Sequence, residues 1–282
     1  MTGRALHVER RGRGPALMLL HGFTGTGRSL ADLSAAFERE FDTVAPDLPG
    51  HGASTGGARD GRYAFDDTLR DLVATLDAAG HRRAHWLGYS MGARLALGCA
   101  VRHPERVASL VLIGGRAGIA DPAERAARRL ADDELAARIE AIGVAAFVDE
   151  WLAQPLFATQ QRLDPAVRAE QRHARLVHDA RELAASLRGL GPGMQPPLFA
   201  DLPRVDVPVL LVVGVLDTRF VAAAHEMAAS LPHAEVCEIA AAGHAAHLEQ
   251  PAAVIAAVGD FLRRVTRPAS FPPSHSVQET AT

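Results

Sequence analysis

The distribution of apolar positions divides most of the chain into short apolar runs and longer amphipathic stretches. Residues 16–20 and 209–213 are unbroken apolar runs, a pattern typical of strands buried on both faces of a parallel sheet. Residues 65–79 instead carry apolar side chains three or four positions apart, which predicts a helix with one buried face. The alternation of the two patterns predicts an α/β fold with a mostly parallel central sheet and helices on both of its faces.

The same patterns place the remaining elements of this fold along the chain. Strands are expected at 6–10, 16–20, 43–45, 84–87, 107–113, 209–213 and 236–239. Helices are expected at 28–38, 65–79, 93–102, 222–230 and 251–265. Loops punctuated by Pro and Gly separate them, as at 47–52.

A different composition marks the middle of the chain, where segments rich in Arg, Glu and Ala favour helices and no convincing strand occurs. Helices are expected at 122–138, 144–153, 165–179 and 181–190. A helical insertion between two strands of a sheet indicates a cap, which we place after the sixth strand. The predicted organisation is a core of residues 1–115 and 201–266, a cap of residues 116–200, and a disordered tail at 267–282, where Pro, Ser and Thr are frequent.

Composition and charge narrow the classes of function. The chain has 282 residues, 48% of them hydrophobic, and a formal net charge of -3, which argues against general disorder and against a nucleic-acid partner. The two cysteines, Cys99 and Cys237, lie far apart in apolar surroundings and suggest core side chains rather than a disulfide framework. We find no bilayer-length apolar run and no signal-peptide core. We therefore expect a cytoplasmic protein without membrane insertion, a monomer or weak homo-oligomer.

The first candidate for chemistry is the pentapeptide Gly88-Tyr89-Ser90-Met91-Gly92, which reads Gly-x-Ser-x-Gly. An apolar run precedes it and a helix-forming run follows, so the serine is expected on a sharp, strained turn between strand and helix. A Cβ at either glycine would crowd that turn. The turn exposes the hydroxyl of Ser90 and directs the N–H of Met91 toward whatever Ser90 contacts.

A serine hydroxyl needs a base to accept its proton and a third group to orient that base. Asp217 follows the predicted strand at 209–213, and His244 follows the one at 236–239. Carboxyl ends of parallel strands share one edge of a sheet, so these two residues and Ser90 are expected to converge as a Ser-His-Asp triad in that chain order. His247 is the rival base; its place beyond the strand end assigns it to packing or to the start of the last helix.

The loop that follows the run at 16–20 begins His21-Gly22-Phe23. It offers the N–H of Phe23, which together with that of Met91 is expected to form an oxyanion hole. The alternative is a plain turn that ends a strand.

Several motifs together resemble the α/β-hydrolase fold over residues 6–265, and more narrowly the 2-succinyl-6-hydroxy-2,4-cyclohexadiene-1-carboxylate synthases of menaquinone biosynthesis. The matching stretches are 20–25 (LHGFTG), 47–52 (DLPGHG), 88–94 (GYSMGAR), 151–157 (WLAQPLF) and 243–251 (GHAAHLEQP). Arg94 and the stretch at 151–157 are the more selective of these features. One departure is Ala93, where the family usually has Gly.

The resemblance implies a lyase without a metal or cofactor, in which a serine activated by the histidine takes a proton from a cyclohexene ring and pyruvate is eliminated. Its substrate is a small anionic metabolite, and arginines bind carboxylates in a bidentate fork. By similarity, Arg94, Arg125 and Arg175 would bind the substrate, and Tyr89 and Trp151 would line the site. For Arg125 and Arg175 a solvated helix face remains the alternative.

Two other functions stay open at this point. The same triad would serve a hydrolase of a small carboxylate ester, lactone or C–C diketone bond, because one fold hosts many chemistries. A binding module without catalysis is disfavoured, because all three triad positions and the oxyanion loop are present.

Overall fold

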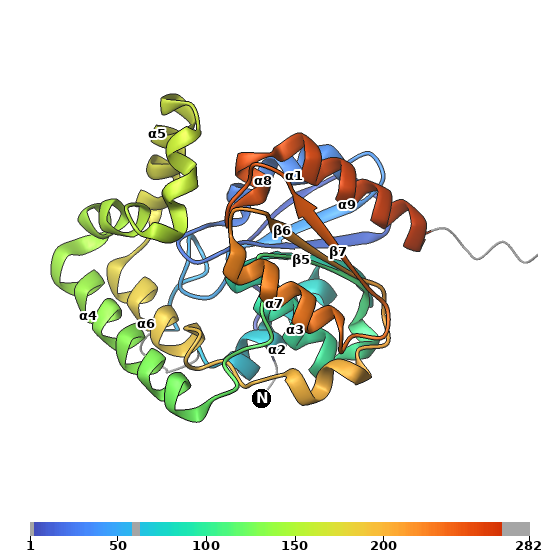
Figure 1. Cartoon of the computed structure of the whole chain (residues 1–282), viewed down its shortest axis with the longest axis horizontal. Coiled ribbons are helices and arrows are strands. Elements are labelled where there is room, and N and C mark those ends of the chain that lie inside the picture. Colours follow the sequence, from blue (N-terminus) through green and yellow to red (C-terminus); the bar gives the residue numbers. More distant parts are fainter. Residues whose placement is uncertain (1–2, 58–62, 267–282) are drawn as a thin grey trace, which may run out of the picture.

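The computed structural model describes residues 3–57 and 63–266, and the predicted tail at 267–282 lies outside them (Figure 1). Seven described strands form one sheet in the order β1-β3-β2-β4-β5-β6-β7, in which only β1 is antiparallel to its neighbour. The strands are β1 (Val8–Arg11), β2 (Ala16–Leu20), β3 (Asp42–Pro46), β4 (Ala84–Tyr89), β5 (Val107–Ile113), β6 (Val209–Gly214) and β7 (Ala234–Ile239). The mostly parallel sheet predicted from the apolar runs is confirmed.

Helices cover both faces of this sheet, as the alternation predicted (Figure 1). The core helices are α1 (Ala31–Phe37), α2 (Phe65–Ala78), α3 (Met91–Arg102), α7 (Thr218–Ala228), α8 (Ala246–Glu249) and α9 (Pro251–Thr266), with short 3-10 turns η1 (Gly27–Leu30), η2 (Pro104–Arg106) and η5 (Phe199–Arg204). Alternate side chains of β2 pack on the two opposite faces of the sheet. Leu17 and Leu19 pack in the cluster that contains α1 and α9, whereas Met18 and Leu20 pack in the one that contains α2, α3 and α7. This alternation is the reason why every position of β2 is apolar.

The cap segment forms a separate group of helices beside the sheet, on the left of Figure 1. It contains α4 (Pro122–Leu152), η3 (Pro155–Arg162), α5 (Pro165–Ala174), η4 (Arg175–Val177) and α6 (Ala180–Leu190). Ile139 and Phe147 of α4 pack against Leu183 and Leu187 of α6. The cap follows β5, the fifth described strand, and not the sixth strand as we predicted. The structure describes only one strand, the antiparallel β1, before β2.

Two details of the cap differ from the predicted helices. The two helices expected at 122–138 and 144–153 are joined end to end in α4 and meet at a kink, where Gly143 has φ 75°; the second ends at Leu152. Glycine accepts this left-handed conformation without a steric penalty, so the helix bends there. The helix expected at 165–179 ends at Ala174, after which η4 turns the chain toward the core.

Aspartates begin the three α-helices of the cap. Asp121 accepts a hydrogen bond from the Glu124 N–H at 2.8 Å, and Asp164 accepts one from the Ala166 N–H at 2.7 Å. Asp179 accepts bonds from the first turn of α6 in the same way. Such caps satisfy N–H groups that have no partner within the helix and stabilise it by about 1 kcal/mol each. These three aspartates therefore mark the residues at which the α-helices of the cap begin.

The length and composition of the described helices indicate whether one of them could cross a membrane. No single described helix is both long and apolar enough to cross a bilayer; α4 and η3 reach that composition only when taken together across a 73° bend.

Candidate active site

The turn between β4 and α3 carries Ser90 in a strained conformation, at φ 50° and ψ -105°. The Ser90 N–H donates to the Ile113 carbonyl of β5 at 2.9 Å, which anchors the turn to the sheet. A Cβ on Gly92 would lie 2.1 Å from the Leu20 carbonyl oxygen, and one on Gly88 would lie 2.3 Å from the backbone of Gly92. Both glycines are thus required by close backbone packing, as the motif predicted.

Three side chains from distant parts of the chain meet at this turn. The Oγ of Ser90 lies 3.0 Å from Nε2 of His244, and Nδ1 of His244 lies 2.8 Å from Oδ2 of Asp217. The His244 side chain is 1% exposed and that of Asp217 is 10% exposed. Asp217 precedes the first residue of α7, and His244 lies between β7 and α8. The arrangement has the contacts that a hydroxyl–imidazole–carboxylate relay requires.

The ring of His244 is confined on several sides. Its centroid lies 4.5 Å from the Phe220 ring and 5.4 Å from that of Tyr89. Gly114 follows β5 at φ 58°, and a Cβ there would lie 3.0 Å from Cε1 of His244. The glycine therefore leaves room for the imidazole, and the two aromatic rings limit its movement.

His247, the rival base, lies in α8 with its ring centroid 4.4 Å from that of Tyr89. Burial, together with the charges of His244 and Arg175, lowers the pKa of His247 to about 3. Its Nδ1 has no hydrogen-bond partner among the described residues. It is a buried, neutral ring that packs against Tyr89 and not against Ser90.

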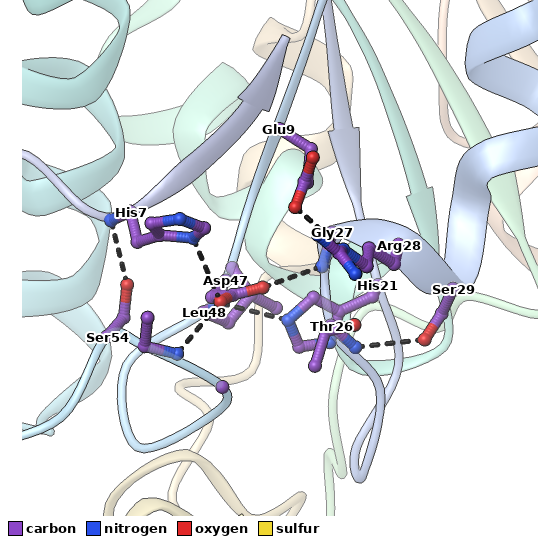
Figure 2. Close-up of polar contacts among 12 residues, drawn as sticks. His7, Glu9, His21, Thr26, Gly27, Arg28, Ser29, Asp47, Leu48 and Ser54 are labelled. Carbon is purple, nitrogen blue, oxygen red and sulfur yellow. Dashed lines mark hydrogen bonds and ion pairs between the residues drawn. The ribbon is translucent and has the colours of Figure 1, made fainter. Parts of the chain in front are cut away.

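The loop of residues 21–27, which we call the oxyanion loop, is held by a polar network drawn in Figure 2. The Asp47 carboxylate accepts hydrogen bonds from the Gly27 N–H at 2.8 Å and the Ala53 N–H at 2.9 Å, and it contacts Nδ1 of His7 at 3.1 Å (Figure 2). The N–H of Leu48 donates to Nε2 of His21 at 2.9 Å. These contacts join the oxyanion loop to the loop at 47–54.

A third segment, from the cap, reaches the same loop. Nε2 of His178 donates to the Thr24 carbonyl at 2.8 Å, and its Nδ1 accepts from the Gly52 N–H at 3.1 Å. The N–H of Thr24 donates to Nε2 of His51 at 3.3 Å. Burial lowers the pKa of His178, which favours the neutral ring that these bonds need. Sequence reasoning missed His178, because no local motif marks it.

The two residues predicted to form the oxyanion hole, Phe23 and Met91, come from different segments of the chain. Phe23 is in the oxyanion loop, and Met91 is the first residue of α3. In the loops and turns that the structure describes, neither N–H donates to another backbone group. A Cβ on Gly22 would lie 2.8 Å from the Tyr89 ring, so the loop approaches the turn at Ser90 closely.

A cavity of about 460 Å³ lies between the turn at Ser90 and the cap. Its wall comprises Phe23, Tyr89, Ser90, Met91, Arg94, Gly114, Arg116, Arg128, Ala131, Asp132, Leu135, Trp151, Gln154, Leu156, Phe157, Arg175, Leu187, Leu190, Gly191, Pro192, Arg219, Phe220 and His244. This volume suits a small molecule. Except for Asp217, which lies behind His244, and Arg125, every residue predicted for the site lines this cavity.

Two of the predicted arginines, Arg94 of the core and Arg175 of the cap, line the cavity. Arg94 of α3 donates to the Leu190 carbonyl at 2.9 Å, and burial lowers its pKa to about 10, which leaves it charged at neutral pH. Arg175 of η4 donates to the main chain and, at 3.0 Å, to the side-chain oxygen of Gln171. Its Nε is buried and has no partner among the described residues.

The structure places Arg125 away from the cavity, in the first turn of α4. Its Nη1 donates to the carbonyls of Ile119 and Ala120, at 2.9 and 3.3 Å. Arg128, about one turn further along α4, lines the cavity and donates to Asp132 at 2.7 Å. The choice between the two depends on where α4 lies above the core, which is not visible in a sequence crowded with arginines.

Two more arginines in the wall were missed by sequence reasoning. Arg116 follows β5 by three residues, and Arg219 follows Asp217 by two. Both positions lie just beyond the carboxyl end of a strand, and that proximity is the signal that could have found them.

Aromatic side chains join the cap to the oxyanion loop. The Trp151 ring lies 5.3 Å from that of Phe23 and 5.9 Å from that of Phe147, and Phe157 approaches His244 at 6.4 Å. Aromatic pairs at such distances add about 0.5–1.5 kcal/mol beyond their buried area. They therefore help to hold the cap over the cavity.

The described residues contain no group of three His, Cys, Asp or Glu side chains placed to hold a metal ion. Cys99 and Cys237 are both free.

Comparison with known proteins agrees with this geometry. Residues 15–251 match the family model described as alpha/beta hydrolase fold. Because the match covers most of the chain, the protein belongs to the α/β hydrolase fold family.

Particular relatives narrow the comparison further. A protein of Escherichia coli O1:K1 / APEC named 2-succinyl-6-hydroxy-2,4-cyclohexadiene-1-carboxylate synthase is 34% identical over 250 residues, which is 88% of this chain and 94% of that protein. A Bacillus subtilis (strain 168) protein, provisionally given the same name, is 36% identical over 89% of this chain and 91% of its own length. The solved structure of MenH from S. aureus superposes with a TM-score of 0.89 at 30% identity and covers 93% of this chain and 99% of its own.

Proposed function

We propose that this protein is a 2-succinyl-6-hydroxy-2,4-cyclohexadiene-1-carboxylate synthase. In this reaction pyruvate is eliminated from 2-succinyl-5-enolpyruvyl-6-hydroxy-3-cyclohexene-1-carboxylate. The similarity to the named Escherichia coli relative supports the assignment over nearly the whole chain.

The observation that carries the proposal is the charge of the cavity wall. Among the described residues, the wall holds five arginines but only one carboxylate, Asp132, which pairs with Arg128. A neutral ester does not need such a wall, whereas a substrate with several carboxylates does, since each charge-assisted hydrogen bond contributes about 1.5–3 kcal/mol. The excess of positive charge beside Ser90 favours an anionic substrate.

The triad geometry supports a proton-transfer role. Nε2 of His244 accepts the Ser90 hydroxyl proton, and Ser90 Oγ takes the ring proton next to the succinyl carbonyl. The released electron pair moves through the ring and breaks the C–O bond to the enolpyruvyl group. This group leaves as the enolate of pyruvate and takes the proton held by the charged His244 ring to become pyruvate, while Ser90 keeps the ring proton as its hydroxyl hydrogen. Asp217 orients the imidazole and stabilises its charged form.

Negative charge develops on the succinyl carbonyl oxygen as the ring proton leaves. We expect the N–H groups of Phe23 and Met91, which donate to no other backbone group in the described loops and turns, to receive that oxygen. One such donor contributes roughly two to three orders of magnitude in rate. In this scheme the oxyanion hole stabilises an enolate rather than a tetrahedral intermediate.

Release of pyruvate from the authentic enolpyruvyl substrate tests the assignment. Wild-type protein should release pyruvate, measured with a coupled dehydrogenase, at least about a thousandfold faster than Ser90→Ala, because the activated serine is lost. Short p-nitrophenyl esters provide the competing substrate. Rapid hydrolysis of those esters without pyruvate release would overturn the lyase assignment in favour of a hydrolase.

A further inference from the structure

A small recess opens from the side of the main cavity, next to the start of α7. It has a volume of about 160 Å³ and is lined by Arg116, Arg219, Phe220, Ala222, Ala223 and Glu226. Arg116, Arg219 and Phe220 also line the main cavity, so the two spaces share one wall. The Phe220 ring, 4.5 Å from that of His244, separates the recess from the triad.

The two arginines of this recess are held without a carboxylate partner. Neither forms an ion pair within 4.0 Å in the described part of the chain, whereas four arginines of the cap, Arg128, Arg138, Arg172 and Arg188, do. The Nε atom of Arg116 is buried and lacks a hydrogen-bond partner among the same residues. Burial and the charge of Arg219 lower the pKa of Arg116, an effect that the Glu226 carboxylate partly offsets.

Arg116 is partly buried and Arg219 is exposed, and an anion that enters the recess can accept charge-assisted hydrogen bonds from both guanidinium groups. Arg116 lies three residues after β5 and before the first helix of the cap, and Arg219 lies at the start of α7, so both backbones are anchored near strand ends of the sheet. Arg175 belongs to the cap and Arg94 contacts the cap at Leu190. The recess is therefore a second cationic region, beyond Phe220 on the His244 side of the cavity.

We propose that Arg116 and Arg219 form an anion subsite that binds the terminal carboxylate of a flexible substrate arm, which extends from the reacting ring past Phe220 into the recess. The identity of that carboxylate as part of the enolpyruvyl substrate rests on the proposed function. The small side chains of Ala222 and Ala223 leave space for the arm. The subsite selects substrates by charge and length, and it takes no part in proton transfer.

Substitution of the two arginines tests the subsite. In Arg116→Gln and Arg219→Gln the KM for pyruvate release should rise about tenfold to a hundredfold, the equivalent of one charge-assisted hydrogen bond, and kcat should change less than about threefold. Ala223→Leu, which fills the recess without a change of charge, should also raise KM. Arg204→Gln, an exposed arginine whose side chain is 84% exposed, is the matched control. Unchanged KM in both arginine variants would overturn the subsite.

A second readout does not depend on the lyase reaction. Propane-1,2,3-tricarboxylate should slow the labelling of Ser90 by a neutral fluorophosphonate, and the double variant should need about tenfold more of it for the same protection. Equal labelling rates without tricarboxylate verify that the triad is intact. Protection without pyruvate release would reject the proposed function and keep the subsite. Equal protection of wild type and double variant, or no protection of either, would reject the subsite.

Discussion

Nε2 of His178, in the cap, donates a hydrogen bond of 2.8 Å to the main-chain carbonyl of Thr24 in the oxyanion loop. The two residues are 154 positions apart in the sequence. Thr24 has φ 67°, a left-handed conformation that is unfavourable for threonine. The cap thus contacts the loop at a strained residue next to the proposed donor Phe23.

Removal of this contact should affect catalysis more than substrate binding. We expect His178→Ala to lower kcat for pyruvate release about tenfold to a hundredfold, because a displaced donor in the oxyanion hole acts mainly on the transition state. His178→Gln, which retains a donor and an acceptor, should recover part of the loss. His173→Ala, at an exposed position of the cap, is the control. A rise in KM with constant kcat would contradict this role.

Asp217→Asn tests the orientation of the imidazole. The amide cannot stabilise the charged ring and favours the wrong tautomer, so kcat should fall about 10³- to 10⁴-fold with little change in KM. Steady-state kinetics measure both constants. Asp201→Asn, in η5, should behave as wild type. A loss smaller than tenfold for Asp217→Asn would mean that another group orients His244.

Substitution of an arginine in the cavity wall should lower kcat/KM more than substitution of an arginine outside the wall. We expect Arg94→Gln to lower kcat/KM by about tenfold to a hundredfold through the loss of a charge-assisted hydrogen bond. Arg125→Gln should change it less than about threefold, because the hydrogen bonds of Arg125 to described residues go to the main-chain carbonyls at 119–120.

Arg94 also donates to the Leu190 carbonyl, so thermal unfolding of each variant should accompany the kinetics. An equal loss of kcat/KM in the two variants would contradict the assignment of Arg94 to the substrate.

Stability should fall with pH through His85, a buried residue of β4 that is far from the reaction. Burial and the charge of Arg83 lower the pKa of His85 to about 4, whereas an unfolded histidine titrates near about 6.5. Between these values the unfolded state binds more protons, so the contribution of His85 is complete above pH 6.5 and is lost as the pH falls toward 4.

Urea unfolding at pH 7 and pH 5 measures the effect. The free energy of unfolding of wild type should lose about 2 kcal/mol more than that of His85→Asn over this interval, since one group contributes at most about 1.4 kcal/mol per pH unit. His173→Asn serves as the exposed control. Parallel pH dependence of wild type and His85→Asn would disprove the assignment.

Much of the fold, and the three candidate triad residues, could be predicted from local pattern. Apolar runs specify strands because both faces of a parallel sheet are buried. The glycines of the turn at Ser90 were predicted from the motif, and a Cβ at either position would lie within 2.3 Å of backbone atoms. Ser90, Asp217 and His244 could be grouped because each directly follows a predicted strand. The start of α7 was predicted four residues too late, at 222 instead of 218, because its first turn, Thr-Arg-Phe-Val, has weak helix propensity.

The tertiary structure alone decided which arginine of α4 lines the cavity, and it alone decided the contact of His178. Arg125 and Arg128 are three residues apart on one helix, yet one binds loop carbonyls and the other lines the cavity. An arginine side chain takes whichever acceptor the packing brings near it, and those acceptors come from distant segments. The sequence by itself therefore determined the sheet, the turn at Ser90 and the chain order of the three candidate triad residues. Only the docking of the cap on the core decided which charges face the cavity, because that depends on contacts between residues far apart in the chain.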